Sequence, residues 1–173
     1  MTLKKFVVIP LIIAVLAFLI QIIDQLLSPV MCPAPNNGFC WIAFQSWAVY
    51  FLAGCNLQGG IKALIGYATG IAASILIMNM AGWLGCLGFF SVPIAVGLVA
   101  FSLIFLERTT WFSLIPSMFI GAGVYFAFMS YIPNATFVNA AITEMVYCVL
   151  GLAFGVVTIA LRTAYEKLIF KKH

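Results

Sequence analysis

The feature that most constrains this chain is a series of six apolar stretches in which charged side chains are almost absent. The stretches cover about residues 6–27, 40–54, 61–80, 87–106, 111–132 and 140–161. A helix needs about 20 mostly apolar residues to cross roughly 30 Å of hydrocarbon, and all but the second stretch reach that length. Because lipid offers the backbone no hydrogen bonds, such stretches predict helices rather than barrel strands. We therefore predict an all-α membrane protein with six transmembrane helices in a single domain, residues 1–173.

Composition argues against the other common classes of protein. Charged residues make up 7% of the 173 residues, whereas an ordinary soluble domain has about 25%. So few charges cannot cover a water-facing surface, which excludes a soluble enzyme, a nucleic-acid-binding domain and a disordered chain. The expected partner is the lipid bilayer, and no nucleic acid is expected as a ligand.

The basic residues predict how the chain is oriented in the membrane. If the N-terminus lies inside, all of them fall in inner segments: Lys4, Lys5, Lys62, Arg108, Arg162, Lys167, Lys171 and Lys172. The outer segments, about 28–39, 81–86 and 133–139, contain none. Cytoplasmic loops carry an excess of Lys and Arg, so this bias predicts a multi-pass protein with both termini in the cytoplasm. No small-residue cleavage site follows the first stretch, which is expected to be retained.

The last stretch carries a polar stripe. Intervals of three and four residues, which place side chains on one face of a helix, separate Glu144, Cys148, Gly151, Gly155, Thr158 and Arg162. A stripe with a carboxylate at one end and a guanidinium at the other is typical of a wall along a water-accessible route. It is equally typical of a packing seam with charges at the two membrane surfaces, and both interpretations stay open.

Two acidic residues are expected at the outer ends of their helices. Asp24 lies near the end of the first stretch, and Glu144 lies about one turn inside the last. Acids within a membrane are costly and mark functional sites by default. They could form a shared acidic vestibule for cations or amines, or they could be solvated at the interface. A proton-coupled carrier would require one of them to be buried.

Small residues at four-residue intervals predict which helices pack closely. The third stretch has Gly66, Gly70 and Ser74, and the fifth has Ser117 and Gly121. Helices in lipid associate through such small side chains, although the same glycines would also suit a pathway lining. A short similarity between residues 63–68 and 118–123 raises the expectation of three helical-hairpin repeats, since repeats are common in transport proteins.

The connection between the second and third stretches is the best local candidate for function. Gly59 and Gly60 let the backbone approach another chain or a solute closely, Gln58 supplies amide groups, and Lys62 fixes the inner boundary. Because the second stretch is short, this segment either dips into the membrane to line a cavity or forms a tight cytoplasmic turn.

No motif for catalysis, metal binding or cofactor binding is found in the sequence. There is no nucleophile elbow, zinc-protease motif or phosphate-binding glycine loop, so we expect neither an enzyme nor a cofactor. The five cysteines have no metal-ligand spacing. Cys32 and Cys40 either form a disulfide on the outer side or are buried as small apolar residues.

Three segments carry a family resemblance. Residues 50–62 read YFLAGCNLQGGIK, residues 115–122 read IPSMFIGA, and residues 150–155 read LGLAFG. In this order they resemble the YcdZ-like family, small bacterial inner-membrane proteins of unknown function. The resemblance implies six helices and a bacterial inner membrane, but it implies no activity. Asp24 and Glu144 match no part of the family pattern.

The sequence thus predicts a small-solute channel or facilitator. A small neutral or weakly polar solute is favoured because the mid-membrane polar groups are not ionisable. A homo-oligomer is expected. The residues expected to line the pathway or contact the solute are Asp24, Gln58, Gly59, Gly60, Lys62, Gly121, Glu144, Gly151, Gly155 and Thr158. The alternative function is a non-transporting membrane subunit that recruits or stabilises a partner protein.

Overall fold

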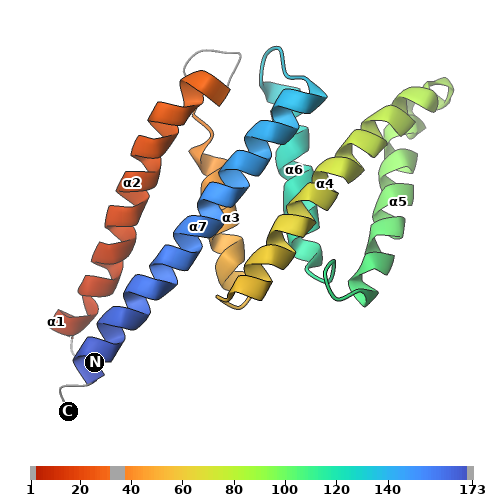
Figure 1. Ribbon diagram of the computed structural model, residues 1–173. Coiled ribbons are helices and arrows are strands. Elements are labelled where there is room, and N and C mark those ends of the chain that lie inside the picture. Colours follow the sequence, from red (N-terminus) through yellow and green to blue (C-terminus); the bar gives the residue numbers. More distant parts are fainter. Residues whose placement is uncertain (1–2, 32–37, 171–173) are drawn as a thin grey trace.

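The computed structural model describes residues 3–31 and 38–170 as helices joined by short connections (Figure 1). The α-helices are α1 (Leu3–Phe6), α2 (Val8–Met31), α3 (Cys40–Leu52), α4 (Leu57–Trp83), α5 (Ser91–Ile104), α6 (Ile115–Tyr131) and α7 (Phe137–Phe170). Two 3₁₀ helices flank α5: η1 (Gly85–Phe90) precedes it and η2 (Phe105–Arg108) follows it. No strand occurs among these residues, which confirms the predicted all-α fold.

Four helical segments are long and apolar enough to cross a membrane. They are α2, α4, the unit Gly85–Arg108 that contains α5, and α7, in agreement with the predicted membrane protein. The other two apolar helices are shorter, with 13 residues in α3 and 17 in α6. At 1.5 Å per residue they extend over about 20 Å and about 26 Å, less than the roughly 30 Å of a bilayer core.

Local backbone signals move several helix ends away from the predicted bounds. The third predicted stretch, 61–80, corresponds to α4, which starts earlier, at Leu57. The Asn56 side chain accepts the Gly59 N–H at 2.8 Å and caps the helix there. The stretch 87–106 is interrupted at Gly88, whose φ of 53° breaks the helical geometry inside η1, before α5 begins at Ser91. The last helix runs past residue 161, where Arg162 and Glu166 form an i,i+4 ion pair at 2.9 Å.

Successive helices run in alternating directions between the two ends of the molecule. In Figure 1, α2, α4 and α6 run upward, whereas α3, α5 and α7 run downward. The lower end holds both α1 and the C-terminal part of α7. There the Tyr165 hydroxyl donates a hydrogen bond to the Lys5 carbonyl at 2.7 Å, so the first and last helices are joined.

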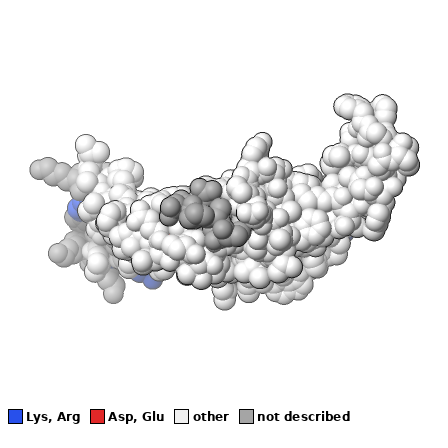
Figure 2. Space-filling view, turned by 90° about the horizontal axis from the view of Figure 1, so that it is seen from above, with Lys and Arg blue, Asp and Glu red and all other residues white. Residues whose placement is uncertain are grey.

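Charge is concentrated at that lower end. Lys5, Lys62, Arg108, Arg162 and Lys167 all belong to the parts of their helices that lie there. Seen from above, the molecule is almost entirely uncharged, and Lys and Arg atoms are visible only at the edge near α1 and the end of α7 (Figure 2). The two ends of the helix bundle are therefore electrostatically distinct.

The α4 and α6 helices pack side by side and run in the same direction. Near their lower ends, Lys62 Nζ donates to Ser113 Oγ at 3.2 Å. Higher up, Ser74 Oγ donates to the Ala122 carbonyl at 3.2 Å. Small residues make this contact possible, because a Cβ at Gly70 would lie only 2.7 Å from the Ala122 backbone nitrogen.

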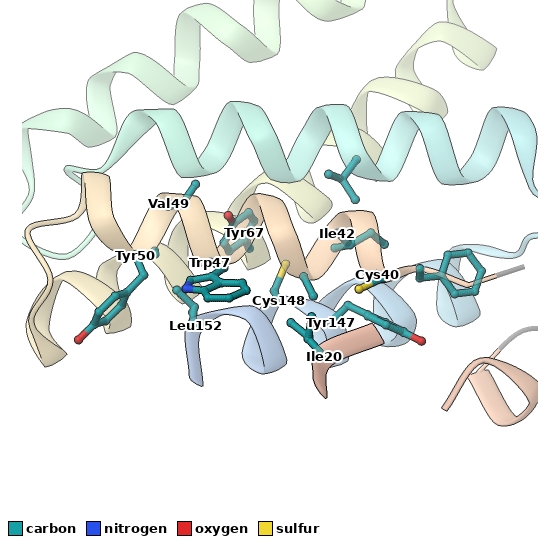
Figure 3. Close-up of a cluster of buried hydrophobic side chains, with 14 of the residues drawn as sticks. Ile20, Cys40, Ile42, Trp47, Val49, Tyr50, Tyr67, Tyr147, Cys148 and Leu152 are labelled. Atoms are coloured by element: carbon teal, nitrogen blue, oxygen red, sulfur yellow. The ribbon is translucent and has the colours of Figure 1, made fainter. Parts of the chain in front are cut away.

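The α3 and α7 helices form a second parallel pair. Ser46 Oγ donates to the Cys148 carbonyl at 2.6 Å, and Trp47 Nε1 donates to Thr158 Oγ1 at 3.0 Å. The core of the protein is centred on this pair, together with Ile20 of α2 and Tyr67 of α4 (Figure 3). The short helix α3 thus compensates for its length with an extensive buried face.

The chain consists of two halves of three helices, and each parallel pair joins one half to the other. The first half is α2–α3–α4 and the second is α5–α6–α7; each consists of a long, a short and a long segment, and the two halves start in opposite directions. The short helix of each half packs on the last helix of the other half, since α3 contacts α7 and α6 contacts α4. The three hairpin repeats expected from the sequence stay a prediction. Residues 63–68 and 118–123, which carry the similarity, lie where α4 and α6 pack on each other.

Candidate functional site

Asp24 is held in the core beside the start of α3. Its carboxylate accepts the Phe39 N–H at 2.8 Å and the Gln21 amide at 3.3 Å, and only 2% of the residue is exposed. Because Phe39 precedes the first turn of α3, the carboxylate places negative charge at the positive end of that helix. Gly38 leaves room for it, since a Cβ there would collide with the carboxylate. Asp24 is therefore not solvated at the interface, and it supports the start of α3.

The segment that joins α3 to α4 forms a tight turn. Gly54 and Cys55 have positive φ angles of 92° and 56°, which reverse the chain before Asn56 caps α4. Of the two alternatives for this segment, the structure has the turn. Cys32, the expected disulfide partner of Cys40, lies outside the described residues.

The candidate residues of this segment face different surroundings. Gly59 packs directly on the Ala53 backbone, and a Cβ at Gly60 would lie 3.3 Å from the Tyr50 ring. Gln58 is exposed at the helix start, and Lys62 donates a hydrogen bond to Ser113, which lies just before α6. The structure therefore does not bring these side chains together around one point.

The three candidate glycines within the bundle lie where helices touch. A Cβ at Gly121 would lie 3.0 Å from the Tyr67 Cα atom. A Cβ at Gly151 would lie 2.8 Å from Ser46 Cβ, and one at Gly155 would lie 2.6 Å from Tyr50 Cγ. In this conformation these glycines form the α4–α6 and α3–α7 seams.

The lower part of the α7 stripe borders a pocket. Thr158 is buried, donating to the Phe154 carbonyl at 2.7 Å and accepting from Trp47. Together with Arg162 and Cys55 it lines a pocket of about 240 Å³ against α2. Thr158 thus belongs both to the α3–α7 contact and to the wall of this pocket, and a water-accessible route along the stripe stays a prediction.

Glu144 occupies the most unusual position in the protein. It is fully buried, and neither carboxyl oxygen has a hydrogen-bond partner among the described residues. The only ion pair found in the described part of the chain joins Arg162 to Glu166, so no cation compensates the carboxyl group. Burying a polar group without a hydrogen bond costs about 1–3 kcal/mol, and an uncompensated charge costs more. Solvation at the interface does not account for Glu144.

Tyr67 of α4 is a second buried polar group close to Glu144. Its hydroxyl is buried and unpartnered within the described residues, and it lies within electrostatic range of Glu144 and Cys148. Figure 3 shows Tyr67 and Cys148 in the same buried cluster. Because α4 and α7 are the last helices of the two halves, this polar cluster lies across the junction between them. No three His, Cys, Asp or Glu side chains gather to hold a metal ion in residues 3–31 and 38–170.

A groove opens between the two short helices. It has a volume of about 410 Å³, with Trp41, Gln45, Ala48, Val49 and Leu52 of α3 on one side and Ile120, Gly123, Val124 and Ala127 of α6 on the other. Gln45 supplies the one amide side chain of this lining. Gly123 widens the groove, because a Cβ there would meet no atom within 4 Å.

Sequence reasoning missed Tyr67 and the groove. Tyr67 is a single aromatic residue in an apolar stretch, and nothing in its spacing indicates that its hydroxyl lies near Glu144. Gln45 is recognisable as a polar residue in a membrane helix, but its opposition to Gly123 depends on the contact between α3 and α6. Both features follow from tertiary packing between the halves.

The comparisons with known proteins bear on family and not on activity. No curated protein and no solved structure matches the chain. One family model matches residues 7–162, a range that includes the α-helices from α2 to α6 and most of α7. Since this match covers most of the 173 residues, the chain belongs to the DUF1097 family, a family of proteins of unknown function.

Proposed function

We propose that this protein is a small-solute channel or facilitator, not an enzyme, and that it passes a small neutral or weakly polar solute across a membrane. The observation that carries the proposal is the exchange of helices between two oppositely directed halves. Many transporters consist of such inverted halves, with the solute site at the interface between them. In this protein the α3–α6 groove and the Glu144–Tyr67 cluster both lie at that interface.

The proposal includes six membrane crossings, with α3 and α6 as the short ones. Short or interrupted helices in corresponding positions of two halves are typical of solute sites in transporters. The basic lower end supports a cytoplasmic location for both termini, since Lys and Arg accumulate on that side of membranes. The YcdZ-like resemblance supports a bacterial inner membrane.

A homo-oligomer is the second part of the proposal. Most of α5 faces outward, with Ala95 and Val99 as its buried residues, and α2 is also largely exposed. These faces are available to lipid or to a second copy of the chain. Size measurement in detergent, with the detergent mass subtracted, would determine the number of subunits.

The groove gives a direct test by flux measurement. Purified protein is reconstituted into liposomes, and swelling or uptake is followed for small amides, polyols and amines. The change Gly123→Leu puts a side chain into the groove at a position where a Cβ meets no atom within 4 Å. We expect it to lower the flux of the permeant solute at least about tenfold, because transport barriers depend exponentially on free energy.

Gly97→Leu on α5 is the matched control, because a Cβ at Gly97 also meets nothing within 4 Å and lies away from the groove. It should leave flux unchanged. If no solute permeates the wild-type liposomes, the facilitator is excluded and the partner-recruiting subunit becomes the better explanation. Equal flux in wild type and Gly123→Leu would remove the groove from the pathway.

A further inference from the structure

The carboxyl group of Glu144 is the buried ionisable group that the proposed facilitator leaves unexplained. It is completely buried, and both of its oxygens lack a hydrogen-bond partner in the described part of the chain. The other buried acid, Asp24, is accounted for by its bonds to Phe39 and Gln21. Glu144 therefore differs from a structural acid.

Its surroundings contain hydroxyl and thiol groups but no described cation. Four helices pack on α7: α2, α3, α4 and α6. Tyr67 of α4, Tyr125 of α6 and Cys148 of α7 lie within electrostatic range of Glu144. From α2 and α3, Asp24 and Cys40 face Tyr147 on a neighbouring part of α7.

No basic residue in the described part of the chain forms an ion pair with Glu144. The nearest one along its own helix is Arg162, about 27 Å distant at 1.5 Å per residue, and it pairs with Glu166. Tyr125 cannot donate to Glu144 in this conformation, because its hydroxyl already donates to the Phe137 carbonyl at 2.9 Å. A proton is the one ligand that satisfies a carboxylate here without additional space.

We propose that Glu144 is a proton-binding site at the junction of the two halves, and this inference rests on the proposed transport function. In the closed conformation the carboxyl group holds its proton and is sealed between the halves. When the halves separate, water reaches the group, and the carboxylic acid releases the proton to that water and becomes a carboxylate. Such acids at the junction of two halves act as proton relays in membrane transport.

Two measurements on the full-length protein in detergent test the site. Dicyclohexylcarbodiimide, which adds to protonated carboxyl groups in apolar surroundings, should label Glu144, and labelling should decrease as pH rises. Peptide mass mapping distinguishes it from the other acids, Asp24, Glu107 and Glu166. Glu144→Gln should lose this label, whereas Glu107→Gln, at an exposed position, should keep it.

The second measurement does not depend on access of the reagent. A group that is protonated when folded and ionised when unfolded stabilises the protein at low pH, and this stabilisation is lost as pH rises. As pH rises from acidic to alkaline, the unfolding temperature of wild type should therefore fall more than that of Glu144→Gln. Equal pH profiles of wild type and Glu144→Gln would overturn the proton site, and so would Glu144 labelling that is constant with pH.

The flux assay separates the two proposals. If a solute permeates but the Glu144→Gln profile matches wild type, the facilitator stands and the proton site is wrong. If the pH profiles differ as expected but no solute permeates, the proton site stands without the transport function. Where both hold, the flux of wild type should vary with pH, and the flux of Glu144→Gln should not.

Discussion

The two buried acidic side chains differ in role because their surroundings differ. Asp24 accepts two hydrogen bonds and contributes to the first turn of α3, whereas Glu144 has no partner in the described residues. Both were predicted from the sequence as acids near the ends of membrane helices. Their different environments could not be predicted, because the Phe39 N–H and the Tyr67 hydroxyl come from other parts of the chain.

The role assigned to Asp24 predicts a specific order of stability among variants. Asp24→Ala removes the acceptor of the Phe39 N–H and leaves that donor buried, which costs about 1–3 kcal/mol. Asp24→Asn keeps a side-chain oxygen in the same place and should lose less. Thermal unfolding in detergent measures both, and an Asn variant as unstable as the Ala variant would contradict the hydrogen-bonding role.

At the scale of helices, small residues determine which elements come together. Hydropathy predicted the approximate positions of the helices, because a membrane imposes a minimum length on each apolar stretch. Glycine spacing also identified the packing faces of α4, α6 and α7. The partners of those faces were not predictable, since small residues of similar spacing occur on several helices and pairing is decided by the three-dimensional fit.

Because α4 and α6 approach closely, substitution of two glycines of α4 should have very different effects on stability. Gly70→Leu would force a side chain against the α6 backbone, and overpacking of this kind costs about 1–3 kcal/mol or more. Gly82→Leu, in the same helix but facing open space, is the control. The unfolding temperature should be lowered for Gly70→Leu alone. An equal decrease for both variants would argue against the α4–α6 seam.

At the scale of the whole molecule, the two halves complete each other. The most extensive contact of α3 is with α7 of the second half, and that of α6 is with α4 of the first half. The sequence did not reveal this exchange, because the two halves share no extended similarity and differ in the lengths of their short helices. The correspondence between the two halves is therefore visible in the helix contacts and not in the sequence.

This exchange predicts the behaviour of a divided chain. Cutting after Leu84, the residue between α4 and η1, separates the two halves without removing any helix. Each half expressed alone should be degraded, and the two expressed together should accumulate and co-purify. Stable accumulation of either half alone would show that the contacts between halves are not needed for folding.

The parallel pairing of α3 with α7 also has a consequence for biosynthesis. Ser46 bonds to Cys148, a residue that leaves the ribosome 102 positions later. During translation, α3 is therefore a short apolar segment that must wait for its neighbour while most of the protein is still being made. A membrane insertase or chaperone that shelters this segment would be required until the last helix arrives.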